Sequence, residues 1–324
     1  MLNKPRILIA SPASSASNNG NWQTAYRWSQ FLGARYHVEI ARQWDSASTA
    51  PDALIALHAR RSADSVKAYA KSGGPLVLVL TGTDLYRDIR HDDDARLSLE
   101  LAHTLVLLQD AGLEELPAAL RGKAVVIYQS APPLAPQPAE DGMFQVLMVG
   151  HLRAEKDPLT FMRAAMQASA PGLRFVQVGG ALDDSLGQQA QETAARCPGY
   201  RWPGPMAHDA TRALLRQSRL LVVPSVMEGG ANVIVEAVTS GVPVLASDIS
   251  GNRGMLGADY AGYFPVGDAA ALAHLIERTA TEPDFEHLLR AQCAVRLPLF
   301  APEREKATVL RLMDNALTQH RTTS

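Results

Sequence analysis

Cysteine is scarce in this chain, and neither sign of charge is in clear excess. The 324 residues include only 2 cysteines, Cys197 and Cys293, which stand far apart and without the spacing of metal ligands. This usage indicates free thiols in a reducing compartment and gives no sign of a zinc site. The 31 basic and 33 acidic residues leave a formal net charge of -2. Nothing in this balance indicates a broad electrostatic attraction to nucleic acid or to anionic lipid, and any anionic ligand must be held locally.

Long apolar runs are also missing. The N-terminal stretch MLNKPRILIASPASS contains only a few consecutive apolar residues, which suit a first strand. It falls far short of a signal-peptide core or a membrane span. We expect a cytoplasmic protein without stable membrane association.

Short runs of Val, Leu and Ile recur between longer segments that suit helices. Continuous apolar strands separated by helices indicate a parallel sheet that is covered on both faces. In the first part of the chain these runs are RILIA (6–10), ALIAL (53–57), LVLVL (76–80), TLVLL (104–108) and AVVIY (124–128).

A proline-rich segment, SAPPLAPQPAEDG (130–142), interrupts the pattern and is the one convincing linker. After it the strands resume as QVLMVG (145–150), RFVQVG (174–179), LLVVP (220–224) and PVLAS (243–247). The chain length suits two domains. We predict two doubly wound α/β domains, residues 1–135 and 140–301, with a final amphipathic helix over 302–324 that packs back on the first domain.

The stretch PSVMEGGANVIVEAVTSG places two glutamates eight residues apart around a Gly-Gly pair. It follows a predicted strand and leads into a helix, which is where doubly wound sheets bind anions. Carboxylates can accept hydrogen bonds from sugar and ribose hydroxyls, and glycine amides can bind phosphate oxygens. Alternatively, Glu228 caps the helix and Glu236 belongs to a solvated face.

This stretch, with the following GVPVLASD, resembles the E-x7-E signature of retaining GT-B glycosyltransferases of family 4. The resemblance implies two Rossmann-like domains that face a cleft, a nucleotide-sugar donor in the second domain, and neither a metal nor a cofactor. Glu228 would act at the donor sugar and Glu236 at the ribose. The amides between them would bind the donor, and these belong to Gly229, Gly230, Ala231 and Asn232.

A second matching motif, VGHLRAEKDP, follows the first strand after the linker. The family carries an Arg and a Lys here to neutralise the donor diphosphate. Lys156 matches, whereas His151 stands where the Arg is expected, and Arg153 is available to compensate. The alternative for Lys156 is a surface lysine at a helix start, where a cation opposes the helix dipole.

Weaker elements complete the predicted donor site. VGGA and WPGPM resemble the loops that hold ribose and base in this family, with Gly180 and Met206 as the candidate residues. The segment SNNGNWQ, with Asn19 and Gly20, resembles the glycine-bearing loop that closes on the diphosphate. Each of these segments could equally be an ordinary turn or polar loop.

Two strand ends in the first half carry polar groups. TGTDLY offers Thr81, Thr83 and Asp84 as positioning or catalytic residues, although Asp84 could instead cap the next helix. LHARRSADSV places His58, Arg60 and Arg61 directly after a strand, and such groups suit a phosphate or another oxyanion. A solvated basic turn is the alternative for this pair of arginines.

ALHARRSA, LTGTDLYRDI and VGHLRAEKDP together resemble the selenosugar synthases of selenoneine biosynthesis, a branch of family 4. That resemblance implies transfer of a sugar from UDP-N-acetylglucosamine or UDP-glucose to selenophosphate. The charged run from Asp92 to Asp94 is better explained as a solvated helix start than as a metal motif. Three alternatives stay open, namely a glycosyltransferase with a glycan, lipid or small alcohol acceptor, a sugar-nucleotide epimerase, and a non-catalytic UDP-sugar-binding protein.

Overall fold

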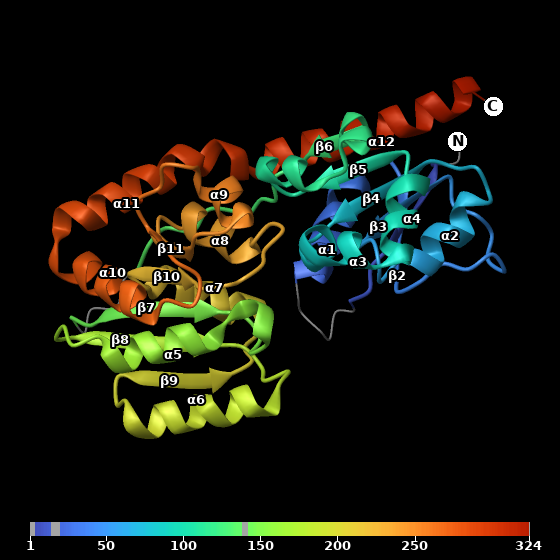
Figure 1. Ribbon diagram of the computed structural model, residues 1–324. Helices are drawn as coiled ribbons and strands as arrows, with labels where there is room; N and C mark the ends of the chain where they lie inside the picture. The colour runs from blue at the N-terminus through green and yellow to red at the C-terminus, as the bar shows by residue number, and fades with distance from the viewer. Residues whose placement is uncertain (1–3, 14–19, 138–141, 324) are drawn as a thin grey trace. The chain divides into compact units, whose positions relative to one another are not determined.

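The computed structural model describes residues 4–13, 20–137 and 142–323. Contacts between residues divide the chain into two compact units. Unit 1 comprises Met1–Gln129, Glu228–Gly230 and Ala301–Ser324, and unit 2 comprises Ser130–Met227 and Ala231–Phe300. Figure 1 shows the parallel sheet of each unit flanked by helices.

Unit 1 contains a six-stranded sheet in the order β2-β1-β3-β4-β5-β6. All neighbouring strands are parallel. The central strands are buried along their whole length, which is why they are continuous apolar runs. The strands are β1 (Arg6–Ala10), β2 (His37–Ala41), β3 (Ala53–Leu57), β4 (Leu76–Leu80), β5 (Thr104–Leu107) and β6 (Ala124–Val126).

Helices cover both faces of this sheet. Alternate strand residues pack on one side against α2 (Ala63–Ala70) and α4 (Asp93–Leu101). The others pack against α1 (Gly20–Leu32) and the C-terminal helix α12 (Pro302–Thr323). Short helical segments join these elements, namely a π-helical turn η2 (Asp84–Asp88), α3 (Ile89–His91), η3 (Asp110–Glu115) and η4 (Ala118–Lys123).

Unit 2 repeats the plan with the strand order β12-β11-β10-β7-β8-β9, again all parallel. The chain builds the sheet outward from β7 in one direction and then from β10 in the other. Because crossovers between parallel strands are right-handed, this reversal puts the connecting helices on opposite faces. The strands are β7 (Phe144–Val149), β8 (Leu173–Val178), β9 (Tyr200–Gly204), β10 (Leu220–Val223), β11 (Val244–Ser247) and β12 (Tyr263–Phe264).

The helices of unit 2 are α5 (Pro158–Gln167), α6 (Asp184–Arg196), α7 (His208–Gln217), α8 (Asn232–Thr239), α9 (Ser250–Leu256), α10 (Ala269–Thr281) and α11 (Pro283–Arg296). Two 3-10 turns, η5 (Ala154–Lys156) and η6 (Leu297–Phe300), accompany them. The α/β class and the doubly wound sheets predicted from the sequence are confirmed.

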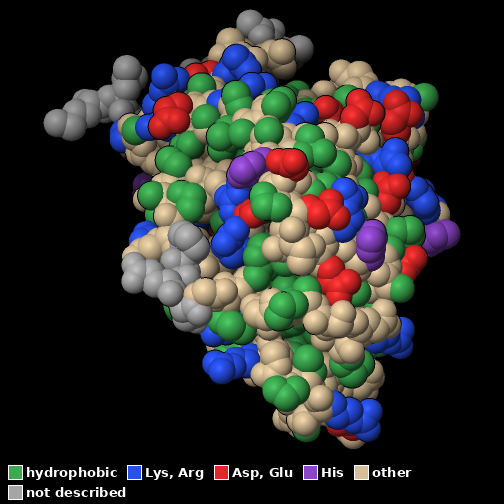
Figure 2. Space-filling model, turned by 90° about the vertical axis from the view of Figure 1, so that its left-hand side faces the viewer, with side chains coloured by type: hydrophobic (Ala, Val, Ile, Leu, Met, Phe, Trp, Pro, Cys, Tyr) green, Lys and Arg blue, Asp and Glu red, His purple; other side chains and the backbone are tan. Residues whose placement is uncertain are grey.

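Basic and acidic side chains are interspersed on the face that Figure 2 displays, in keeping with the small net charge. Within the described ranges, no helix is both long enough and apolar enough to cross a membrane.

Candidate active site

The reversal of strand order in each unit marks where a ligand is expected. In open α/β sheets, ligands bind beyond the carboxyl ends of the strands at the point where the chain changes direction. In unit 2 this point lies between the paired strands β7 and β10. The segment after β7 carries His151, Arg153 and Lys156, and the amide of Val226, after β10, donates to the Glu155 carbonyl at 3.0 Å. Both motifs selected from the sequence therefore leave the sheet at the same point.

His151 is held in one orientation. Its Nδ1 accepts a hydrogen bond from the Gly180 amide at 3.2 Å, and the side chain is half-buried. In a neutral imidazole one nitrogen accepts and the other donates, so an accepting Nδ1 leaves the proton on Nε2. His151 can thus present one N–H to an oxyanion, where the arginine of the family would present several. The Gly180 amide is already engaged with this ring.

The loop from β7 approaches the loop from β8 very closely. Gly179 has φ +150°, and a Cβ added there would lie 1.9 Å from the Gly150 carbonyl oxygen. Only glycine fits this position. The stem of Lys156 lies over Gly150, with carbons 3.5 Å from where a Cβ would stand. The ring of His151 therefore contacts the β8 loop, whereas the stem of Lys156 packs within the β7 loop that carries it.

Lys156 is half-buried, as is Arg153 at the start of η5. The next residue, Asp157, has φ +44° and caps α5, because its carboxylate accepts from the Thr160 amide and hydroxyl. This cap fixes the start of α5 directly after the turn that carries Lys156.

The two glutamates of the E-x7-E stretch occupy different settings. Glu228 is buried and lies in the turn, as predicted, whereas Glu236 is half-buried on α8. The helix begins at Asn232 with Ala231 as its N-cap, so Glu236 lies little more than one turn from its start. Residues Glu228–Gly230 group with unit 1.

The sequence did not point to His208, which is the partner of Glu236. Its Nε2 lies 2.8 Å from Glu236 Oε1. This hydrogen bond raises the pKa of His208, against the effect of partial burial and of Arg212. His208 is the first residue of α7 and follows the loop that was predicted to read the base. This position was the signal in the sequence that could have pointed to it.

That loop differs in part from the prediction. Of the segment WPGPM, Trp202 to Gly204 belong to the edge strand β9, and only Pro205 and Met206 lie in the connection to α7. The indole of Trp202 donates to the Gly179 carbonyl at 2.8 Å. Edge strands tolerate proline because one side of the strand needs no hydrogen bonds, so the Pro203 that suggested a loop is compatible with pairing.

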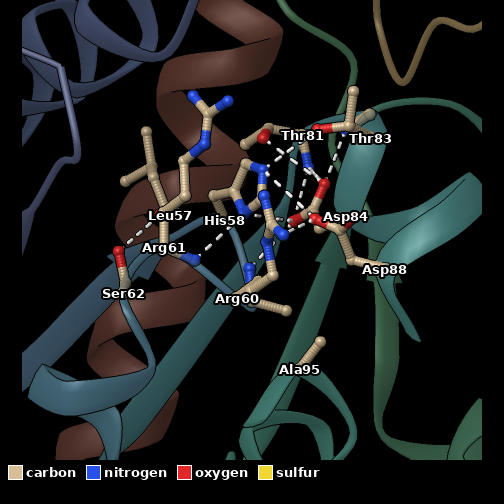
Figure 3. Close-up of polar contacts among 12 residues, drawn as sticks. Leu57, His58, Arg60, Arg61, Ser62, Thr81, Thr83, Asp84, Asp88 and Ala95 are labelled. Atoms are coloured by element: carbon tan, nitrogen blue, oxygen red, sulfur yellow. Dashed lines mark hydrogen bonds and ion pairs between the residues drawn. The ribbon is translucent and has the colours of Figure 1, made fainter. Parts of the chain in front are cut away.

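In unit 1 the switch point lies between β1 and β3. His58, Arg60 and Arg61 follow β3, and Thr81, Thr83 and Asp84 follow β4. Figure 3 shows these groups converging on one cluster, apart from the guanidinium of Arg61. Asp84 is fully buried at its centre, and its carboxylate accepts from the amides of Thr81, Gly82 and Ala59 at 2.8 to 2.9 Å. Asp84 does not cap the helix that follows, because the N-cap of η2 is Thr83 and has no side-chain cap hydrogen bond. Its carboxylate instead ties the two strand ends together.

His58 is buried in this cluster and has a left-handed backbone, with φ +76°. Such a conformation is uncommon outside glycine and is found at functional sites. Its Nδ1 accepts from the Arg61 amide at 3.3 Å, and its Nε2 lies 3.0 Å from the Thr83 hydroxyl. Burial lowers the pKa of His58, although Asp84 opposes this effect. The ring is uncharged at neutral pH, and its Nε2–H donates to Thr83.

The two neighbouring arginines have different surroundings. The Nε of Arg60 lies 3.1 Å from Oδ2 of the buried Asp88, and Figure 3 shows its guanidinium turned toward the carboxylates. The guanidinium of Arg61 points away from them. Of the two arginines predicted to bind an anion together, Arg60 therefore forms an ion pair with Asp88, whereas Arg61 points away from that pair.

The described part of the predicted glycine-bearing segment after β1 is helical, since α1 begins at Gly20, which is exposed. Asn19 lies outside the described residues. The predicted helix start at Asp92 is confirmed, because its carboxylate caps α4 through the Ala95 amide. Within the described part of the chain, no group of three or more His, Cys, Asp or Glu side chains could hold a metal ion.

Comparison with known proteins identifies the second half of the chain. Residues 134–294 match the family described as "Glycosyl transferases group 1". The matched region contains the β7 and β10 loops, and the match confirms the predicted enzyme class, a glycosyltransferase.

Solved structures share the fold along almost the whole chain. HepE of Anabaena, crystallised with UDP and glucose and also with UDP-glucose, has a TM-score of 0.75 and 16% identity over 96% of this chain and 100% of its own. Sucrose-phosphate synthase from Thermosynechococcus elongatus has a TM-score of 0.76 and 17% identity over 98% and 100%. At these identities the likeness concerns the fold, which is that of GT-B glycosyltransferases, as predicted.

Proposed function

We propose that the chain transfers a sugar from a UDP-sugar, either UDP-N-acetylglucosamine or UDP-glucose, to selenophosphate. The observation that carries the donor half of this proposal is the placement of His151 and Lys156 at the β7–β10 switch point of a glycosyltransferase domain. The structures of HepE with UDP and with UDP-glucose support a UDP-sugar as the donor class.

The donor diphosphate would be bound by Lys156, by the Nε2–H of His151 and by the amides after Glu228. Arg153 would add charge at the same loop. In the reaction the bond between the anomeric carbon and the UDP oxygen breaks and its electron pair leaves on UDP. Positive charge and oriented N–H groups at the diphosphate stabilise this departure, and they do so most strongly in the transition state. Glu228 would hold the sugar hydroxyls and Glu236 the ribose.

The acceptor would be an anion whose selenium attacks the anomeric carbon, so that a carbon–selenium bond replaces the carbon–oxygen bond. Such a nucleophile is already charged and needs no base to remove a proton. The resemblance of ALHARRSA and LTGTDLYRDI to selenosugar synthases supports this choice, and the arginine after β3 suits a phosphoryl group. Both cysteines are free thiols, in keeping with action in the reducing cytoplasm.

The test is to incubate the purified chain with each UDP-sugar and selenophosphate, and to follow UDP release and the product mass. Parallel reactions contain thiophosphate, phosphate or glycerol as the acceptor. We expect UDP release with selenophosphate, accompanied by an adduct whose mass contains both sugar and selenium. UDP release only with glycerol would instead support a transferase for neutral alcohols, and donor binding without UDP release with any acceptor would support a non-catalytic binding protein.

A further inference from the structure

A pocket of about 370 Å³ opens at the carboxyl edge of the sheet in unit 1. Pro12, Arg42, Gln43 and Arg61 line it. Three segments supply these residues, because Pro12 follows β1, Arg42 and Gln43 follow β2, and Arg61 follows β3. The pocket therefore borders the β1–β3 switch point, which is where a doubly wound sheet binds its ligand.

Arg42 had no signal in the sequence, because the edge strand before it is half exposed and lacks a continuous apolar run. The pairing of β1 with both β2 and β3 brings Arg42 and Arg61, which are 19 positions apart in the sequence, to one cavity.

The charge of the pocket is one-sided. Its lining holds two guanidinium groups and, among the described residues, no carboxylate. The neighbouring Arg60 differs from these two arginines, because its charge is balanced by the buried carboxylate of Asp88. Both arginines are exposed where they line the cavity, and their like charges favour an anion between them. Guanidinium groups are also the side chains best shaped to grip a phosphoryl group through paired hydrogen bonds.

We propose that Arg42 and Arg61 form a site for a phosphoryl anion in this pocket. The ligand is either a free phosphate-like anion or a phosphomonoester, and the volume lies within the range of small-molecule sites. This inference rests on the proposed function in one respect, because it assigns the site to the acceptor. The assignment replaces the Arg60–Arg61 pair with Arg61 and Arg42, and it gives Arg60 to the buried cluster.

The experiment measures anion binding to the full-length protein without donor, and therefore does not depend on turnover. Binding of thiophosphate and, separately, of glycerol phosphate is followed by ³¹P NMR line broadening. The proteins are the wild type, Arg42→Ala, Arg61→Ala and the control Arg6→Ala, which removes an exposed arginine at the opposite end of β1. Thermal unfolding of each variant checks the fold.

We expect Arg42→Ala and Arg61→Ala each to raise the Kd of the bound anion by about tenfold or more, since each removes a charge-assisted contact. Arg6→Ala should stay within about twofold of the wild type. Tighter binding of thiophosphate than of glycerol phosphate indicates a free anion, and the reverse order indicates a monoester. Equal weakening by all three variants, or an effect of neither pocket arginine, overturns the site. Failure of UDP release alone overturns the proposed function and leaves this site standing.

Discussion

At the residue scale, Asp84 and His58, two of the buried polar side chains of the unit 1 cluster, have different roles. Asp84 accepts three backbone amides and holds the ends of β3 and β4 together. His58 is neutral, and its Nδ1 accepts a hydrogen bond from the Arg61 amide. Its proton is therefore on Nε2, which donates to the Thr83 hydroxyl. The Thr83 hydroxyl, which accepts from His58, keeps its own hydrogen for another partner. Asp84 thus shapes the cluster, and His58 orients the half-buried Thr83.

The role of Asp84 predicts a large effect of Asp84→Asn on stability. The asparagine side chain has one accepting oxygen and an NH₂ group that would face backbone N–H donors, which leaves buried donors without a partner. We expect the free energy of unfolding to fall by about 2 to 4 kcal/mol, measured by urea denaturation. Asp64→Asn, at an exposed carboxylate of the same unit, is the control. Equal stability of the two variants would contradict the role of Asp84 in tying the two strand ends together.

His208 predicts a pH dependence with a defined sign. Its pKa is raised in the folded protein by the hydrogen bond to Glu236, so the folded state binds the proton more tightly than the unfolded state. This stabilisation is fully present below the ordinary histidine pKa of about 6.5 and is lost as the pH rises through the raised pKa.

The Tm difference between the wild type and His208→Gln should therefore be larger at about pH 5.5 than at about pH 9. We expect the stabilising effect to be about 0.5 kcal/mol, because the side chain is only half-buried. A difference that grows with pH would contradict the pairing.

At the element scale, burial decided which strands the sequence revealed. Every strand predicted from an apolar run is present, with ends shifted by at most two residues. Three strands were not predicted, and they lie at sheet edges, where one side meets solvent and the apolar pattern fades. These are β2, β9 and the two-residue β12. Arg42 was not predicted as a site residue for the same reason, because it follows the edge strand β2.

Within unit 1, a buried ion pair joins the C-terminal helix α12 to α1. Glu305 is buried and accepts from Arg27 Nε at 2.8 Å and from the Trp28 indole at 2.7 Å, both on α1. Further along the helix, Val309 and Met313 enter the same core as Trp28.

We predict that Glu305→Ala destabilises the protein by about 3 to 5 kcal/mol, because it leaves a partly buried arginine and a buried indole N–H without this acceptor. Calorimetry should show a lower Tm, while Glu303→Ala, at an exposed position on the same helix, should change the Tm little. An unchanged Tm in Glu305→Ala would show that α12 is held by its apolar contacts alone.

At the scale of the whole molecule, each unit has a strand-order reversal with basic residues beside it. Motif positions in the sequence predicted which loops meet at these points, because loops that follow neighbouring parallel strands share one edge of the sheet. The sequence could not predict the hydrogen bonds that separate similar side chains. The Asp88 contact of Arg60, the Glu236 contact of His208 and the Gly180 contact of His151 depend on distances set by folding.

We propose that the β7–β10 loops bind the diphosphate of a UDP-sugar whose transfer the protein catalyses. The most direct measurement is the rate of UDP release from the UDP-sugar with selenophosphate as the acceptor, compared between the wild type and Lys156→Ala. Arg163→Ala, at an exposed cation of α5, is the matched control. We predict a loss of about 100-fold or more in kcat/KM for Lys156→Ala, because the cation stabilises the departing diphosphate, and little change for the control. A Lys156→Ala variant that remains folded and retains the wild-type rate would contradict diphosphate binding by Lys156.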